Sequence, residues 1–343
     1  MNIGIAAITD GGWQLARRLA ALLPEGELLV GEEQGITASL AANWRHRDGF
    51  ILIMAAGIAV RAIAPLLTDK RSDPCVVVMD ERGRHAISLV SGHLGGGNAL
   101  ARRVAAICGG EAVITTASDT LGLVALDLWA REQRLVAESP RRLTKVSARL
   151  VNKGMVTLYS EIPVEFLPPG LVQVNEMGQA DIIVSNRHID SEALLLRPRN
   201  LVVGVGCNRG TAAEEFDQAL AEILDELRLS RLAIRSLASI SQKNDEQGLL
   251  EFASNNHWPV DFFPGDALNA KAASLDHSEF RLAFSPAAMR AVGASHGVAE
   301  PAALVGAARN HLLSRKRKWK NVTLAIAQAS CMLSAPGLAP KNI

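Results

Sequence analysis

Cysteine and tyrosine are scarce in this chain of 343 residues, which has four cysteines and a single tyrosine. Cys75, Cys108, Cys207 and Cys331 lie far apart, and no two of them form a C-x-x-C pair. This spacing argues against a disulfide framework and against a zinc site, so we predict no protein-bound metal. Free thiols of this kind fit a reducing cytoplasm.

Neither sign of charge predominates, because 36 basic residues are balanced by 35 acidic ones and the net charge is +1. Nucleic-acid-binding domains usually carry a basic excess, and base stacking needs aromatic side chains, which are rare here. The basic run of residues 315–320 is interpreted as a solvated loop. We therefore predict no nucleic-acid partner.

Long apolar segments are also missing. The longest uncharged apolar stretch, residues 49–60, is much shorter than the roughly 20 residues that a membrane-spanning helix needs. The first residues, MNIGI, lack the basic region of a signal peptide. The sequence therefore predicts a cytoplasmic protein with no membrane partner.

Short apolar runs alternate with helical patterns at both ends of the chain. Strands are predicted at residues 3–8, 50–54, 75–79, 113–115, 201–205, 233–240, 259–263 and 322–326. Helices are predicted at residues 14–23, 58–67, 98–108, 211–227, 248–255 and 301–309. This alternation is typical of an α/β protein, with mainly parallel sheets covered by helices on both faces. We expect two three-layer αβα lobes joined by a smaller middle segment. Pro65 is expected to distort or end the helix at residues 58–67, and Asp80 and Glu81 are expected to start a hairpin turn.

The middle segment is less regular than its neighbours and contains several prolines. Helical patterns near residues 123–134 and 142–152 precede short strand patterns at residues 156–159 and 182–184. The expected domains are an amino-terminal α/β domain, a middle domain or connector, and a carboxy-terminal α/β domain. Their residues are 1–120, 121–199 and 200–333, respectively.

The run SGHLGGGN, from Ser91 to Asn98, joins a strand pattern to a helix pattern. Glycines permit a sharp turn and close approach to a ligand, and a helix amino terminus favours an anion. His93 is the titratable residue of this loop, and a histidine pKa of roughly 6.5 suits proton transfer. A tight turn with a purely structural histidine is the alternative. Asp119 follows a predicted strand, where ligand crevices lie in open sheets.

The run GVGCNRGT, from Gly204 to Thr211, lacks the third glycine of a dinucleotide fingerprint because Arg209 stands there, and it is not a P-loop. Arg209 beside backbone N–H groups suits a carboxylate or phosphate, so we favour an anion site over a structural turn. Thr211 with Glu214 predicts a capping box. Cys207 is expected to be a small buried residue rather than a nucleophile. The G-x-S-x-G run at residues 293–297 follows a helical pattern, so it is treated as a chance match.

Several runs taken together resemble the CbiG family. In the amino-terminal part they are residues 55–67, 69–74, 80–83, 91–98 and 113–119. Residues 204–211, 243–249, 297–304 and 321–327 are similar to the domain that CbiG shares with CobE. Asn208, Ser241 and Gln247 depart from the family pattern. The resemblance extends over residues 45–330 and is weakest in the middle segment.

The resemblance implies a cobalt-precorrin-5A hydrolase of anaerobic cobalamin biosynthesis. Water opens the δ-lactone of this polycarboxylate macrocycle, and the extruded ring carbon leaves with its methyl group as acetaldehyde, giving cobalt-precorrin-5B. The cobalt arrives with the substrate, so no cofactor is expected. Other corrinoid pathway enzymes and a second copy of the chain, forming a homodimer, remain open as partners. A non-catalytic corrinoid carrier or scaffold is the alternative.

Within that reaction, His93 is expected to activate water or relay protons, and Asp119 to orient it. Backbone and side-chain donors would hold substrate carboxylates and the developing oxyanion. The expected substrate-binding residues are Gly57, Arg61, Ser91, Gly92, Gly95, Gly96, Asn98, Gly206, Cys207, Asn208, Arg209, Gly210, Thr211, Lys243 and Glu246. The two glycine loops are expected to cradle the macrocycle between the two lobes.

Overall fold

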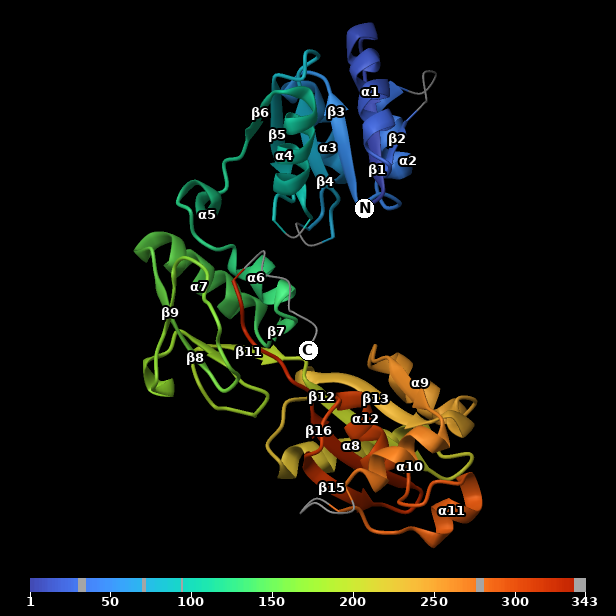
Figure 1. The fold of residues 1–343 in the computed structure, drawn as a ribbon. Helices are drawn as coiled ribbons and strands as arrows, with labels where there is room; N and C mark the ends of the chain where they lie inside the picture. Colours follow the sequence, from blue (N-terminus) through green and yellow to red (C-terminus); the bar gives the residue numbers. More distant parts are fainter. Residues whose placement is uncertain (30–34, 70–71, 94, 276–280, 336–343) are drawn as a thin grey trace. The chain divides into compact units, whose positions relative to one another are not determined.

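A computed structural model describes residues 1–29, 35–69, 72–93, 95–275 and 281–335 of the chain (Figure 1). Lys70, Arg71 and Leu94, which belong to runs that carry the family resemblance, lie outside the described residues. The chain forms two compact units. The first comprises Met1–Leu128 and Leu150–Gly154, and the second Trp129–Arg149 and Met155–Ile343.

The first unit contains a six-stranded sheet of order β2-β1-β3-β4-β5-β6. The strands are β1 (Ile3–Ala7), β2 (Gly26–Leu28), β3 (Gly49–Ile53), β4 (Cys75–Met79), β5 (His85–Val90) and β6 (Glu111–Val113). The helices are α1 (Asp10–Leu22), α2 (Gly35–Asn43), α3 (Ala56–Ile63), α4 (Gly97–Cys108) and the short α5 (Ala117–Thr120). Buried side chains of α1 and α4 pack on one face of the sheet, and those of α2 and α3 on the other. The predicted three-layer αβα lobe is confirmed.

Strand direction changes at β5, which runs antiparallel to β4, whereas β1 to β4 are mutually parallel. Val90, at the end of β5, therefore pairs with Val76 near the start of β4. The loop after β5 lies at the sheet edge where β1, β3 and β4 begin. Since β6 is parallel to β5, the residues that follow β6 lie at this same edge.

Two local predictions in this unit are confirmed. Helix α3 ends at Ile63 and passes into the 3₁₀ turn η1 (Ala64–Leu66), because Pro65 cannot donate to a continuing helix. The acidic pair before Arg82 makes the expected hairpin turn between β4 and β5, in which Gly83 N donates to Asp80 O at 2.9 Å.

The middle segment has a sheet of its own, of order β7-β11-β10-β8-β9. The strands are β7 (Leu135–Ala137), β8 (Val156–Ser160), β9 (Leu171–Gln173), β10 (Ile182–Val184) and β11 (Leu194–Pro198). Strands β8 to β11 are parallel, and β7 pairs antiparallel with β11. Its helical elements are α6 (Leu126–Glu132), α7 (Pro140–Lys153) and η2 (Met177–Gln179).

The last part of the chain contains a sheet of order β14-β13-β12-β16-β15. The strands are β12 (Leu201–Cys207), β13 (Ile234–Ile240), β14 (Val260–Phe263), β15 (Leu312–Lys318) and β16 (Val322–Gln328). The helices are α8 (Ala213–Glu226), α9 (Gln247–Asn255), α10 (Gly265–Ala273), α11 (Pro286–Val292) and α12 (Ala299–Ala307), with η3 (Arg231–Ala233) and η4 (Ser241–Lys243). Buried side chains of α8 and α9 pack on one face, and those of α10 and α12 on the other. This confirms the second αβα lobe.

Two predictions for this lobe are wrong. The basic run belongs largely to β15, an edge strand rather than a loop, whose residues Arg315 to Lys318 are exposed. Charged side chains suit such a strand because they discourage pairing with another chain. Thr211 does not cap α8, since its hydroxyl donates to Asn208 O at 2.9 Å and Ala212 occupies the cap position. No helix among the described residues has the length and apolar character needed to span a membrane.

Candidate functional site

The loop from β5 to α4 packs tightly against itself at its glycine positions. A Cβ on Gly92 would lie 2.5 Å from Asn98 Oδ1, and one on Gly95 would lie 2.6 Å from Ser91 Cβ. Gly96 has a φ of 84°, in the left-handed region that glycine adopts readily. These glycines are therefore required for the packing of the loop itself.

The same loop uses several of its amide donors internally. Asn98 N donates to Gly92 O at 2.9 Å, and Gly96 N donates to His93 O at 2.9 Å. The Ser91 hydroxyl donates to Asp73 O at 3.0 Å. The expected anion contacts of Ser91, Gly92, Gly95 and Gly96 stay predictions, and the amides of Gly96 and Asn98 already have partners.

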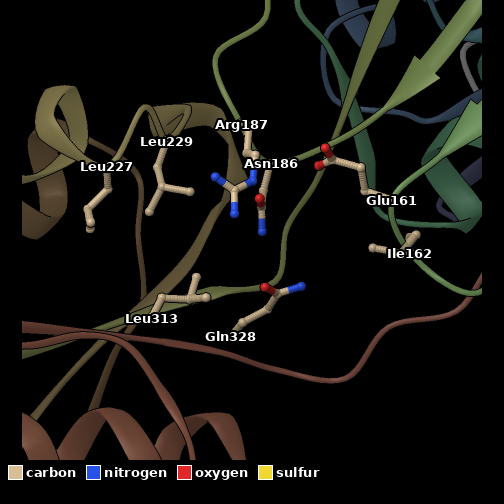
Figure 2. A pocket seen from close by; sticks show the side chains of 8 residues that line it. All are labelled: Glu161, Ile162, Asn186, Arg187, Leu227, Leu229, Leu313 and Gln328. Atoms are coloured by element: carbon tan, nitrogen blue, oxygen red, sulfur yellow. The ribbon is translucent and has the colours of Figure 1, made fainter. Parts of the chain in front are cut away.

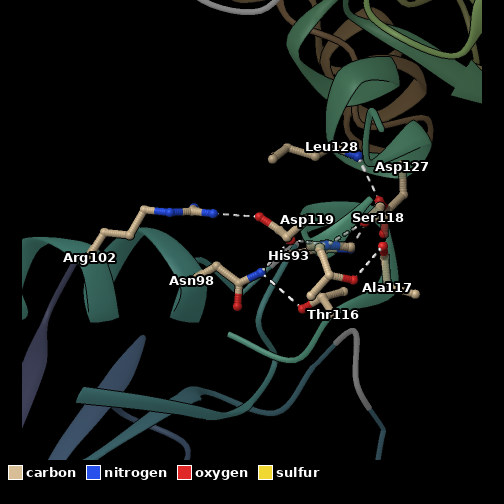
Figure 3. A network of polar contacts seen from close by, with 10 residues as sticks. His93, Asn98, Arg102, Thr116, Ala117, Ser118, Asp119, Asp127 and Leu128 are labelled. Atoms are coloured by element: carbon tan, nitrogen blue, oxygen red, sulfur yellow. Dashed lines mark hydrogen bonds and ion pairs between the residues drawn. The ribbon is translucent and has the colours of Figure 1, made fainter. Parts of the chain in front are cut away.

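His93 and Asp119 lie together at this edge of the sheet (Figure 3). His93 Nε2 is 3.1 Å from Asp119 Oδ2 and 3.2 Å from the Ser118 hydroxyl. Asn98 Nδ2 donates to the same Asp119 oxygen at 2.9 Å. Arg102 Nη2 donates to the other carboxylate oxygen at 2.6 Å. Residues from the loop and α4 thus converge on one carboxylate of α5.

Asp119 is held in its ionised form. Partial burial acts to raise the pKa of its carboxyl, but hydrogen bonds from Arg102 and His93 outweigh this effect and hold the pKa below its ordinary value. An ionised carboxylate can only accept, so its contact with His93 requires the proton to be on Nε2. The neutral ring then keeps its lone pair on Nδ1.

His93 Nδ1 faces a second carboxylate, with 3.8 Å to Asp127 Oδ1. That oxygen also accepts the Leu128 amide at 2.9 Å, near the start of α6. A proton taken up by Nδ1 would therefore be stabilised by a nearby negative charge. The His93 and Asp119 side chains are 22% and 20% exposed, which leaves the pair shielded but accessible.

Arg102, Ser118 and Asp127 were not predicted as site residues. Arg102 lies four residues after Asn98 on α4, a spacing that places both side chains on one helix face. That spacing was the available signal for Arg102. Asp127 carried no comparable signal, because its contact with His93 depends on the fold.

Gly57 and Arg61 are not part of this group. Gly57 is near the start of α3, beyond the carboxyl end of β3, at the sheet edge opposite the His93 loop. The exposed Arg61 guanidinium donates to Gly57 O at 3.1 Å, one turn back along its own helix. The structure separates these two residues from His93, so any binding role for them belongs to a different edge of the sheet.

The second predicted group lies where β12 and β13 end. Arg209 Nη1 pairs with Asp245 Oδ1 at 2.6 Å, and its Nη2 donates to Gln242 O at 2.9 Å. Both side chains of the ion pair are 62% exposed. Asn208 N donates to Asn321 O at 2.9 Å, which fixes the turn to β16.

Glu246 already supplies a negative charge to this group. Its side chain is 4% exposed, and its Oε1 accepts Gly210 N at 2.8 Å while Oε2 lies 3.2 Å from Lys243 Nζ. A carboxylate of the chain itself therefore occupies part of the predicted anion site. Cys207 lies nearby, and burial raises the pKa of its thiol to about 11, which fits the prediction that it is not a nucleophile.

The G-x-S-x-G run lacks the setting of a nucleophile elbow. Helix α11 precedes it, and Gly293 ends that helix in the left-handed conformation. The Ser295 hydroxyl donates to Asn269 Oδ1 at 2.9 Å and lies 2.8 Å from His296 Nδ1. Within the described ranges, no three His, Cys, Asp or Glu side chains gather as a metal-ion site. The expected independence from a cofactor stays a prediction.

Comparison with known proteins assigns most of the chain to three consecutive family regions. Cobalamin synthesis G N-terminal matches residues 38–119, the cobalamin biosynthesis central region matches residues 124–198, and Cobalamin synthesis G C-terminus matches residues 201–327. The chain is 32% identical to the cobalt-precorrin-5A hydrolase of Priestia megaterium, over 95% of this chain and 94% of that one.

Two further relatives fit the same pattern. The cobalt-precorrin-5A hydrolase of Salmonella typhimurium is 36% identical over 78% of this chain and 83% of its own length. Protein CobE of Sinorhizobium sp. is 32% identical over 40% of this chain and 80% of its own length. The predicted CbiG resemblance is confirmed, and the chain belongs to the CbiG family.

Proposed function

We propose that this protein is a cobalt-precorrin-5A hydrolase, which opens the δ-lactone of its substrate and releases acetaldehyde to give cobalt-precorrin-5B. The names of its full-length relatives support this activity. The structural observation that carries the proposal is the contact of His93 with the ionised Asp119. This pair provides a base whose proton is fixed on one nitrogen and whose other nitrogen is basic.

In the first step, His93 Nδ1 takes a proton from water as the water oxygen bonds to the lactone carbonyl carbon. The lactone C–O bond then breaks, and its oxygen receives the proton from the His93 imidazolium. Asp119 holds the ring through Nε2 throughout, and Arg102 and Asn98 hold Asp119. Asp127 stabilises the transient positive charge at Nδ1.

In the second step, the alcohol formed by lactone opening loses its hydroxyl proton to His93. The C–O bond becomes the carbonyl of acetaldehyde while the carbon–carbon bond to the macrocycle breaks. The macrocycle keeps the electron pair and takes up a proton. The same base therefore serves both steps, and the cobalt remains part of the substrate.

Acetaldehyde release from cobalt-precorrin-5A by the purified protein tests this proposal. We expect His93→Ala to slow release by about 10²–10⁴-fold, the usual contribution of a general base. Wild-type rates in that variant would remove His93 from the mechanism. Corrinoid binding by the wild-type protein without release above the blank would instead support the carrier alternative.

The second group of residues is proposed to bind substrate carboxylates. Arg209 and Lys243 supply positive charge there, and a substrate carboxylate would compete with Asp245 and Glu246 for these partners.

The domain boundaries at residues 120 and 199, the cytoplasmic location and the absence of a resident cofactor are part of the same proposal. The three separate sheets support the domain boundaries, and the free cysteines support the cytoplasmic location. Other pathway enzymes and a homodimer are proposed as partners.

A further inference from the structure

A cavity of about 350 Å³ lies in the second unit, at the carboxyl edge of the middle sheet. Glu161 directly follows β8, and Asn186 and Arg187 follow β10; all three line the cavity (Figure 2). From β8 the chain adds β9 on one side and then β10 on the other. The cavity therefore lies where the strand order reverses, the position at which open α/β sheets bind ligands.

The backbone around this cavity is fixed by hydrogen bonds. Ser230 N donates to Asn186 O at 2.8 Å, and Arg187 forms an antiparallel bridge with Leu229. Arg187 N also donates to the Ser185 hydroxyl at 2.9 Å. The start of the Arg187 side chain is therefore held in place from two sides, so the cavity wall is preformed.

The polar half of the cavity carries one guanidinium and one carboxylate. In Figure 2 the side chain of Arg187, an exposed residue, points into the space, and no ion pair of its guanidinium occurs among the described residues. Glu161 is engaged by the Ser185 hydroxyl. The side-chain amide of Gln328 also lines the space. An arginine fork without a protein partner is suited to a carboxylate.

The other half of the cavity is aliphatic. Leu227 and Leu229, from the turn after α8, line it together with Leu313 of β15. Ile162, from the loop after β8, adds to this apolar wall. A ligand here would place hydrocarbon against the leucines and its charged end at Arg187. This combination of an apolar wall and few polar groups is typical of small-molecule sites.

We propose that this cavity binds a short aliphatic carboxylate, of the size of propionate, with its carboxylate on the Arg187 guanidinium. The volume suits such a group and is too small for a whole tetrapyrrole. The carboxylate could belong to a side chain of the corrinoid macrocycle or to a free acid. Binding of a macrocycle side chain rests on the proposed function, whereas binding of a free acid does not.

Saturation-transfer NMR with propionate tests the site in the full-length protein. We expect a propionate signal with wild-type protein, with affinity on the order of millimolar. In Arg187→Gln, affinity should fall by about tenfold or more, because a charge-assisted pair is lost. Arg290→Gln is the matched control, since Arg290 is an exposed arginine of the same unit that does not line the cavity. It should bind propionate as the wild type does.

Cobyrinic acid, a stable corrinoid with propionate and acetate side chains, distinguishes the two sources. Displacement of propionate by cobyrinic acid would identify the occupant as a macrocycle side chain. Propionate binding that cobyrinic acid leaves unchanged would identify a free acid. Absence of a wild-type propionate signal, or an equal affinity in folded Arg187→Gln protein, would overturn the site. Because none of these measurements uses acetaldehyde release, failure of the hydrolase proposal is detected separately.

Discussion

At the scale of single residues, the informative feature is the sharing of one carboxylate by three donors. One carboxylate oxygen of Asp119 accepts hydrogen bonds from His93 and Asn98, and the other accepts a hydrogen bond from Arg102. Each donor favours the ionised carboxylate, and that ionisation determines which nitrogen of His93 carries the proton. The chemical state of the histidine is therefore set by residues from α4 and α5 rather than by its own loop.

Replacing Asp119 by Asn tests this dependence. The amide can donate as well as accept, so it no longer forces the proton onto Nε2 of His93. We expect acetaldehyde release to fall by about 10²-fold or more, while corrinoid binding changes little. The test is to measure kcat and KM separately for the wild-type protein and for Asp119→Asn. A large rise in KM with unchanged kcat would indicate a binding role for Asp119 instead.

Replacing Arg102 by Gln tests the charge balance through the pH dependence of stability. The pKa of Asp119 is lowered in the folded protein, so its stabilisation is fully present above the ordinary pKa of 3.8 and is lost as the pH falls through the lowered folded-state pKa. Arg102→Gln should therefore lower the Tm at pH 7, and by progressively less as the pH falls below 3.8. Because Arg102 is 55% exposed, the loss should not exceed about 1 kcal/mol. A larger loss at pH 3 than at pH 7 would contradict the assignment.

At the scale of helices and strands, the close packing of α12 on β12 in the carboxy-terminal lobe depends on a glycine in the strand. A Cβ on Gly204 of β12 would lie 1.8 Å from Ala299 O, at the start of α12. Helix α12 can therefore lie on the sheet only because this position is glycine. In contrast, a Cβ on Gly206 of the same strand would have no neighbour closer than 3.6 Å.

Gly204→Ala and Gly206→Ala form a matched pair on one strand. The first should destabilise the protein by about 1–3 kcal/mol, because α12 must shift away from β12. The second should change stability by less than about 1 kcal/mol. Urea unfolding followed by circular dichroism measures both. Equal effects of the two substitutions would show that α12 does not restrict Gly204.

At the scale of the whole molecule, the segment that follows β16, residues 329–335, joins two sheets within the second unit. After β16, Leu333 N donates to Pro163 O at 2.9 Å and its own carbonyl accepts Glu165 N at 2.9 Å. Ser334 O accepts the buried indole N–H of Trp129 at 3.1 Å. The carboxy-terminal lobe and the middle sheet are therefore linked by long-range contacts that no local pattern reveals.

Leu333→Ala should weaken this link. The Leu333 side chain is 1% exposed, so truncation is expected to cost about 2–5 kcal/mol. Met332→Ala is the neighbouring control, because Met332 is 49% exposed and should be nearly neutral. Thermal unfolding followed by tryptophan fluorescence would report both variants. A neutral Leu333→Ala would show that the segment contributes little to the stability of this unit.

Local sequence patterns determined much of this protein. Alternating apolar and helical runs predicted both αβα lobes, the end of α3 near Pro65 and the turn before Gly83. The glycine loop and the strand end drew attention to His93 and Asp119, whose side chains lie in contact. Their catalytic roles stay predictions. These features depend on the periodicity and chain stiffness of a few neighbouring residues.

Only the tertiary structure decided strand direction and long-range partners. The reversal at β5 separates Gly57 and Arg61 from His93, although all three follow strands in the sequence. Asp127 reaches His93, and Glu246 takes the amide of Gly210, through contacts between distant segments. Local periodicity reports which face of an element is buried, but neither the direction of a strand nor its neighbours, because those depend on the free energy of packing the whole chain.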